Sequence, residues 1–187
     1  MFPFVALPVM RSNFVPLTRT YTSGTAAVET VPVGATAATF RVVGAGGSGG
    51  HDSTDIAGGA GSGGYALKTI AVTGGDSLTY TVGVGGAGQP TDATAGNAGT
   101  SSTLSGAVSG GAVAMTGGFG GAGGIAGVTG AGGTATGGTT NTAGNPGVLT
   151  VGGASVYPTY GAGSNGRSLA GGTSQPGGNG VVILEYT

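Results

Sequence analysis

The chain has 187 residues, of which 47 are glycine, 8 are proline and none is cysteine. Disulfides and thiolate metal sites are therefore excluded, and the length suffices for one domain with its own core. Charged residues make up 6% of the sequence and the net charge is −1, so the chain lacks the basic surface that nucleic-acid binding or docking on an anionic membrane requires.

The composition favours a folded chain in spite of its glycine content. Glycine and proline at this level are typical of low-complexity sequences. Disordered chains, however, are hydrophilic and highly charged, whereas the mean hydropathy here is +0.27. A surface with so few charges is poorly protected against self-association. We therefore expect a folded protein that is built into an assembly.

Residues 1–20 are predicted to form an extended N-terminal arm, because Pro3, Pro8 and Pro16 restrict the backbone to extended geometry. The apolar start lacks a basic residue and a small-residue cleavage site, so we expect no signal peptide. No stretch reaches the roughly 18 apolar residues that a membrane span needs. The arm is predicted to be either an edge strand of its own domain or an anchor on a neighbouring protein. The docking side chains would be Phe2, Phe4, Leu7, Val9, Met10 and Phe14.

Residues 21–187 are predicted to form a single glycine-rich β domain. β-branched and aromatic residues indicate a strand near residues 28–30 and another at 38–43. Two further strands are predicted at 65–73 and 78–84, joined by a hairpin turn. In the second of these, Leu78, Tyr80 and Val82 alternate with threonine, which is typical of a half-buried strand.

The last strand is predicted at residues 181–186, which read Val-Val-Ile-Leu-Glu-Tyr. So many consecutive apolar residues do not suit an exposed edge. We therefore expect this strand to lie in the centre of a sheet, beside an early strand.

Glycine recurs at every third position in the middle of the chain, at Gly121, Gly124, Gly127, Gly130 and Gly133. This period fits neither a helix nor a strand, but it is the period of the polyproline II helix. Collagen shares it and needs abundant proline, which residues 118–135 lack. The pattern therefore predicts short extended segments that lie side by side and hydrogen-bond to one another.

These segments are expected to fold back at a turn such as residues 139–141 or 144–146, where turn-forming residues gather. The larger side chains between the glycines, Phe119, Ile125 and Val128, are expected to pack against the sheets or against a sister subunit.

Residues 20–50, 63–66, 78–86 and 180–183 contain an ordered set of motifs: a Thr-Val-Pro-x-Gly turn, a strand, glycine tracts and a closing apolar strand. In this the chain resembles the glycine-rich domains of phage tail fibres, tip adhesins and virion structural proteins. The resemblance implies a mainly β fold with no significant helix. The frame would be β-sandwich-like (jelly-roll-like), with inserted glycine-rich segments of polyproline II type.

The resemblance further implies a non-enzymatic virion structural protein of a bacteriophage, such as a fibre, a capsid decoration or a tail-tip component. Such a protein would lie on the virion surface after synthesis in the host cytoplasm, contact other virion proteins and form a homotrimer. Two alternatives stay open. One is an adhesin that recognises a host surface glycan or protein. The other is a glycine-rich extracellular or ice-binding protein.

Motifs that suggest chemistry are weak in this sequence. Residues 44–49 contain the G-x-G-x-x-G pattern of dinucleotide-binding sites, but no helix-forming run follows, so no cofactor is expected. His51, Asp52 and Asp55 do not have the spacing of a known metal site. A single histidine and scattered carboxylates provide no catalytic triad or acid pair. We therefore expect neither a metal centre nor an enzyme.

The strongest candidate for receptor recognition is the segment with Tyr157 and Tyr160, followed by Asn165 and Arg167. Tyrosine offers flat apolar area together with a hydroxyl group, which suits contacts with sugars or proteins. The alternative is that these tyrosines cap the glycine-rich segments or pack at a subunit contact.

Overall fold

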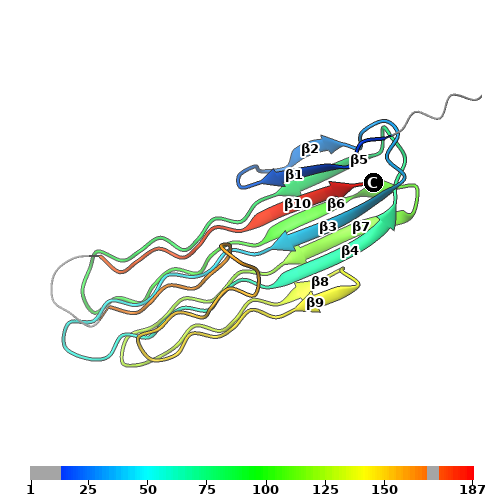
Figure 1. The fold of residues 1–187 in the computed structure, drawn as a ribbon. Coiled ribbons are helices and arrows are strands. Elements are labelled where there is room, and N and C mark those ends of the chain that lie inside the picture. Colours follow the sequence, from blue (N-terminus) through cyan, green and yellow to red (C-terminus); the bar gives the residue numbers. More distant parts are fainter. Residues whose placement is uncertain (1–13, 168–172) are drawn as a thin grey trace, which may run out of the picture.

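The computed structural model describes residues 14–167 and 173–187. The described chain is elongated, with β-strands gathered at one end and extended segments without regular secondary structure running away from them (Figure 1). The described residues contain strands and no helix. The prediction of a mainly β, sandwich-like fold is therefore confirmed.

The strands form two five-stranded sheets in which every neighbouring pair is antiparallel. The first sheet has the order β1 (Leu17–Tyr21), β10 (Val181–Tyr186), β3 (Ala37–Val43), β4 (Tyr65–Ala71) and β9 (Thr140–Thr142). The second has the order β2 (Ala27–Thr30), β5 (Ser77–Thr81), β6 (Ser102–Val108), β7 (Gly111–Gly117) and β8 (Ala135–Thr136). The last strand lies between β1 and β3, so its predicted central position is confirmed.

The core of the sandwich lies between the two sheets and consists of alternating inward side chains. On β5, Leu78 and Tyr80 are 0% and 8% exposed, and Val82 just beyond the strand is 5% exposed, which confirms the alternation expected from the sequence. Phe40 on β3 is fully buried against the same cluster. The other large members come from both sheets: Val42, Leu104, Val113, Met115, Val182, Leu184 and Tyr186.

Sequence patterns did not indicate the central hairpin of the second sheet. Strands β6 and β7 contain serine, glycine and alanine where strands usually carry β-branched residues. Leu104 and Met115 nevertheless face the core, with exposures of 0% and 1%. Strand β1 likewise begins inside the predicted arm, since Leu17 pairs with Tyr186.

Most strands continue at one end of the sandwich into extended glycine-rich segments, here called threads (Figure 1). Together the threads form the glycine bundle, and the loops that join them far from the sandwich form its tip. The threads comprise residues 44–52, 58–64, 83–88, 95–101, 118–124, 129–134, 143–148, 151–155, 161–167 and 173–180.

The thread 44–52 lies in the middle of the bundle, and the direction of its N–H groups changes with a period of three. Gly44, Gly47 and Gly50 donate to the thread 58–64. The next residues in each triplet, at 45, 48 and 51, donate to carbonyl groups at 100, 97 and 94. The remaining residues, at 46, 49 and 52, donate to residues 178, 164 and 167. This three-fold rotation is that of a polyproline II helix, so the predicted bundle of mutually bonded segments is confirmed.

Glycine is required inside the bundle because the threads approach each other closely. A Cβ atom on Gly58 would lie 1.7 Å from the carbonyl oxygen of Val128, and one on Gly61 would lie 1.9 Å from that of Ala131. No side chain fits at such distances. The absence of a Cβ is therefore what allows neighbouring backbones to satisfy each other's N–H and C=O groups.

The chain turns back between β8 and β9, at residues 137–139, next to the first of the two predicted turns, but the second predicted position is wrong. Residues 144–146 lie within a thread, where the N–H of Asn145 donates to Ser62 Oγ. The glycine-rich run instead folds back at residues 125–128, where the N–H of Val128 donates to the carbonyl of Ile125 and φ is positive at both central residues. Asn-Pro is typical of turns, but proline also suits the φ of a polyproline II thread.

Candidate functional sites

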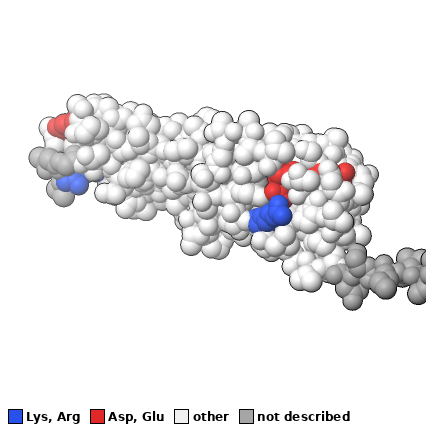
Figure 2. All heavy atoms as spheres, turned by 90° about the horizontal axis from the view of Figure 1, so that it is seen from above, with Lys and Arg blue, Asp and Glu red and all other residues white. Residues whose placement is uncertain are grey.

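Charged side chains of the described residues are confined to two regions, the sandwich and the tip. In the sandwich, Arg19, Glu29, Arg41, Lys68 and Glu185 belong to strands, and Asp76 lies in the turn before β5. Asp52, Asp55, Asp92 and Arg167 belong to the tip or to the end of the thread that enters it. Figure 2 shows the result on one face, where an uncharged surface separates the coloured groups of the tip from those of the sandwich. The tip and the sandwich are therefore the candidate regions for specific polar contacts.

The tip brings together residues that are distant in the sequence. His51 forms isolated bridges with Thr94 and with Arg167, and the residue is 2% exposed. Asp52 is 5% exposed, so it is a buried residue within the loop rather than a free surface carboxylate. Within residues 14–167 and 173–187, no group of three histidine or acidic side chains is arranged to hold a metal ion.

The carboxylates of the tip hold its loops in place. Asp52 Oδ1 accepts hydrogen bonds from the N–H and hydroxyl of Thr54 and from the N–H of Asp55, each at 3.0 Å. Asp92 accepts one from the N–H of Ser53 at 2.6 Å, which ties two loops together. These bonds lower the pKa of both carboxyl groups, for Asp52 through Thr54 and for Asp92 through Ser53. Both therefore serve as structural acceptors that stay ionised at neutral pH.

The tyrosines proposed for receptor binding pack on the sandwich, not at the tip. Tyr157 stacks on Tyr65 of β4 with 5.4 Å between ring centroids, and Tyr160 lies 6.5 Å from Tyr157. Both contact the apolar cluster of Val43, Val181 and Ile183 on the first sheet. This arrangement agrees with the capping alternative, because the rings cover the junction between sheet and bundle.

The four predicted receptor-binding residues do not form one site. Arg167 lies at the opposite end of the thread that begins just after Tyr160, which at about 3.1 Å per residue places them roughly 20 Å apart. Asn165 is exposed, and its Oδ1 accepts a hydrogen bond from the N–H of Gly152 at 2.9 Å. The four residues are therefore divided between three places: the junction of sheet and bundle, the glycine bundle itself, which forms the shaft of the molecule, and the tip.

Of the predicted docking residues, Phe14 falls within the described part of the chain, and Phe2, Phe4, Leu7, Val9 and Met10 lie outside the described residues. Phe14 packs against the sandwich core and lies close to Gly34 in the turn before β3. That turn is at the end of the sandwich opposite the bundle, since β3 runs from it into the thread 44–52. The N-terminal arm therefore joins the domain at the end opposite the tip.

The glycine motif at residues 44–49 has no free backbone for a phosphate. No helix follows it in the described chain, and its N–H groups donate to neighbouring threads and to Ser164 Oγ. A dinucleotide site needs these groups to point at the ligand from a helix N-terminus. The motif is here a packing element.

Sequence reasoning missed a buried charge cluster in the sandwich. Glu29 of β2 is 4% exposed and accepts hydrogen bonds from Arg19 and Tyr21 of β1, each at 2.5 Å, and from Tyr186 of β10 at 3.1 Å. It therefore links the two sheets. The one available signal was a glutamate at an inward position of a predicted strand.

A family model described as a glycine-rich domain matches residues 20–187. No curated protein matches the chain. The described residues contain no helix with the length and apolar character that crossing a bilayer requires.

Proposed function

Because the chain belongs to the glycine-rich domain family, we propose that it is a non-enzymatic structural protein of a bacteriophage particle. It would be a fibre, capsid decoration or tail-tip component attached through its N-terminal arm. The observation that carries the proposal is the separation of the two ends. A hydrogen-bonded, uncharged shaft lies between the end where the arm joins and the tip. Such a shape projects one end away from an attachment point.

The hydrogen bonding within the shaft supports a mechanical role. In the threads 44–52 and 58–64 every N–H donates to a neighbouring thread, so these groups are unavailable to a ligand. The resemblance to virion proteins supports the same role, and the apolar composition of residues 1–20 suits docking on another virion protein. The proposal includes association of the chain into a homotrimer, by analogy with phage fibres.

The attachment is tested by deleting residues 1–13, which leaves β1 and the buried Glu29 cluster intact. The truncated chain should fold with an unchanged melting temperature but be absent from purified particles, as measured by quantitative mass spectrometry. Val84→Ser, at a position 63% exposed on a thread, is the matched control and should be incorporated normally. Incorporation of the truncated chain at the normal stoichiometry would contradict attachment through the arm. If the intact chain is missing from particles, the virion role itself fails.

A second candidate function is receptor binding at the tip. The observation that favours it is that charged residues reappear there, at Asp55 and Arg167 among others, after the uncharged shaft. Asp55→Asn should reduce adsorption of particles to host cells while leaving the amount of the chain per particle unchanged. Loss of assembly in this variant would contradict an adhesin role for the tip.

A further inference from the structure

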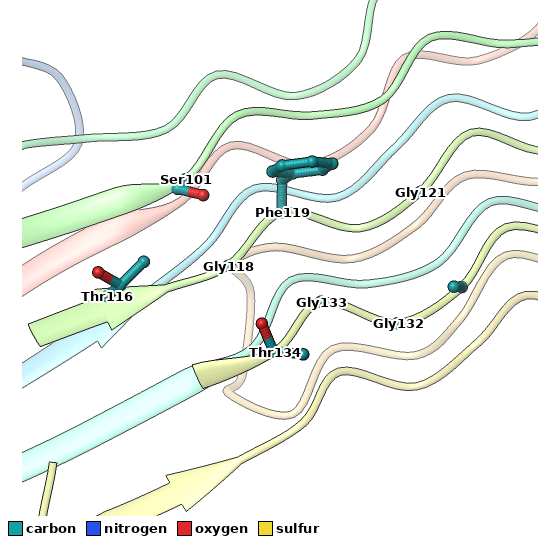
Figure 3. Close-up of a pocket in the computed structure, with 9 residues that line it drawn as sticks. Ser101, Thr116, Gly118, Phe119, Gly121, Gly132, Gly133 and Thr134 are labelled. Atoms are coloured by element: carbon teal, nitrogen blue, oxygen red, sulfur yellow. The ribbon is translucent and has the colours of Figure 1, made fainter. Parts of the chain in front are cut away.

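A shallow groove lies where the second sheet passes into the bundle, away from both the tip and the N-terminal end. Its volume is about 310 Å³. Figure 3 shows the lining side chains at the ends of strands and the starts of threads, with the ring of Phe119 raised above the glycine backbone. The lining residues are Ser101, Thr116, Gly118, Phe119, Gly121 and the run 131–134.

The aromatic ring at this groove, that of Phe119, is exposed and stacks on no other aromatic ring of the described residues. Phe119 is 47% exposed, although it is the largest apolar side chain on the threads 118–124 and 129–134. The period of three explains its direction, because the neighbouring residues 118, 120 and 121 donate their N–H groups to other threads. Residue 119 therefore faces outward, and its ring gives the groove a flat apolar wall.

Hydroxyl and N–H groups surround this ring, and they make no hydrogen bonds with other described residues. The hydroxyl groups of Ser101, Thr116 and Thr134 make no hydrogen bond with other described residues, and neither do the N–H groups of Phe119 and Gly132. Hydroxyl groups both donate and accept. The groove thus combines one apolar face with several donors and acceptors on its rim.

The absence of charged residues in the groove limits the class of ligand that it can bind. None of the lining residues is charged, so an anionic or cationic ligand would lose hydration without gaining an ion pair. A pyranose ring has an apolar C–H face that can lie on an aromatic ring and a rim of hydroxyl groups that match Ser and Thr. The volume lies at the small end of the range for ligand sites, about 300–1,000 Å³, which fits a single ring.

We propose that this groove binds one unit of a neutral saccharide, with its C–H face on Phe119 and its hydroxyl groups on Thr134, Thr116 and Ser101. The site goes beyond the attachment role, because binding is a property of the folded chain whether or not it is part of a particle.

The test uses the full chain labelled with 4-fluorophenylalanine and observed by ¹⁹F NMR. Phe119→Leu identifies the Phe119 signal by its loss. The probes are methyl glucopyranoside, methyl galactopyranoside and N-acetylglucosamine, each added to about 50 mM. With at least one probe the Phe119 signal should shift and saturate with a Kd of about 1–10 mM, as expected for a single weak site, while the signal of buried Phe40 stays in place.

Two threonines on the same thread provide a matched pair. Thr134→Val removes a lining hydroxyl group and should weaken binding about 3- to 10-fold, the effect of one neutral hydrogen bond. Thr129→Val makes the same change on an exposed residue outside the groove and should leave the Kd unchanged. The melting temperature of each variant shows that both remain folded.

Three results would overturn the proposal. One is the absence of any Phe119 shift with all three probes. Another is an equal effect of Thr134→Val and Thr129→Val on binding. The third is a Phe119 signal that changes with protein concentration in the absence of sugar, because this would show that a second copy of the chain covers the groove.

Discussion

The sandwich and the glycine bundle are stabilised by different parts of the chain. In the sandwich, large side chains such as Phe40, Leu78 and Leu104 fill the space between two sheets. In the bundle the interior contains glycine with alanine and serine, and neighbouring backbones contact each other directly. The comparison shows that the same chain can form an interior either from apolar side chains or from main-chain hydrogen bonds when side chains are absent.

The two regions should therefore respond in opposite ways to a change in side-chain size. The sandwich should be damaged by removing atoms, because a cavity remains. The bundle should be damaged by adding atoms, because there is no space for them.

The largest expected effect is that of a single methyl group in the bundle. Gly61→Ala places a Cβ 1.9 Å from the carbonyl oxygen of Ala131, whereas Gly178→Ala meets its nearest atom at 3.0 Å. We expect Gly61→Ala to lower the free energy of unfolding by about 4 kcal/mol or more and Gly178→Ala by about 1 kcal/mol or less. Urea denaturation followed by circular dichroism measures both. Similar losses in the two variants would show that close packing of threads is not the stabilising feature.

Removal of a core side chain should come next. Phe40→Ala in β3 deletes a fully buried ring and is expected to cost about 3–4 kcal/mol. Because β3 continues directly into the thread 44–52, loss of the sandwich should also release the bundle in one transition. Coincident transitions by near- and far-ultraviolet circular dichroism would confirm this coupling, and separate transitions would contradict it.

A buried hydroxyl group in the bundle should have a smaller effect. Ser62 Oγ accepts a hydrogen bond from the N–H of Asn145 at 2.8 Å. Ser62→Ala leaves this donor without an acceptor, at a cost of about 1–2 kcal/mol. Ser105→Ala, on an exposed position of β6, is the control and should cost about 0.5 kcal/mol or less. Equal melting temperatures for the two variants would count against a role for the serine hydroxyl.

The smallest effect concerns pH and the Glu29 cluster. Burial and the hydrogen bond to Glu29 raise the pKa of Tyr21 to about 12, from 10.0. Between these values the unfolded chain ionises this phenol while the folded chain keeps it neutral, so stability falls as the pH rises from about 10 to about 12. Melting temperatures across this window should decline less steeply in Tyr21→Phe. An identical decline in the two proteins would show that Tyr21 does not cause the loss of stability at high pH.

Much of this architecture could be predicted from the sequence because two simple periods were visible. Alternation of apolar residues marked β5, and glycine at every third position marked the threads. The hairpin of β6 and β7 was not visible, because its outward residues are small and only Leu104 and Met115 mark the inward face. Propensity is a poor guide where packing determines the strand.

The candidate sites were harder to predict because they depend on which threads are neighbours. Tyr157 and Arg167 are close in sequence, but a thread separates them, so they lie at different places along the shaft. Conversely, Ser101, Phe119 and Thr134 come from separate segments and meet only because the threads are adjacent. The spacing of residues along a thread determines which way each side chain points, but it does not reveal which thread is the neighbour on that side.

The direction of the N–H groups also determines how the molecule exchanges its amide protons with solvent. In the thread 58–64 each amide proton is engaged, so exchange should require opening of the whole bundle. In the outer thread 118–124 the amides of Phe119 and Ala122 have no acceptor among the described residues, whereas those of the intervening residues do. In this outer thread, fast exchange with deuterium should therefore occur at every third residue, which is the repeat of the polyproline II helix.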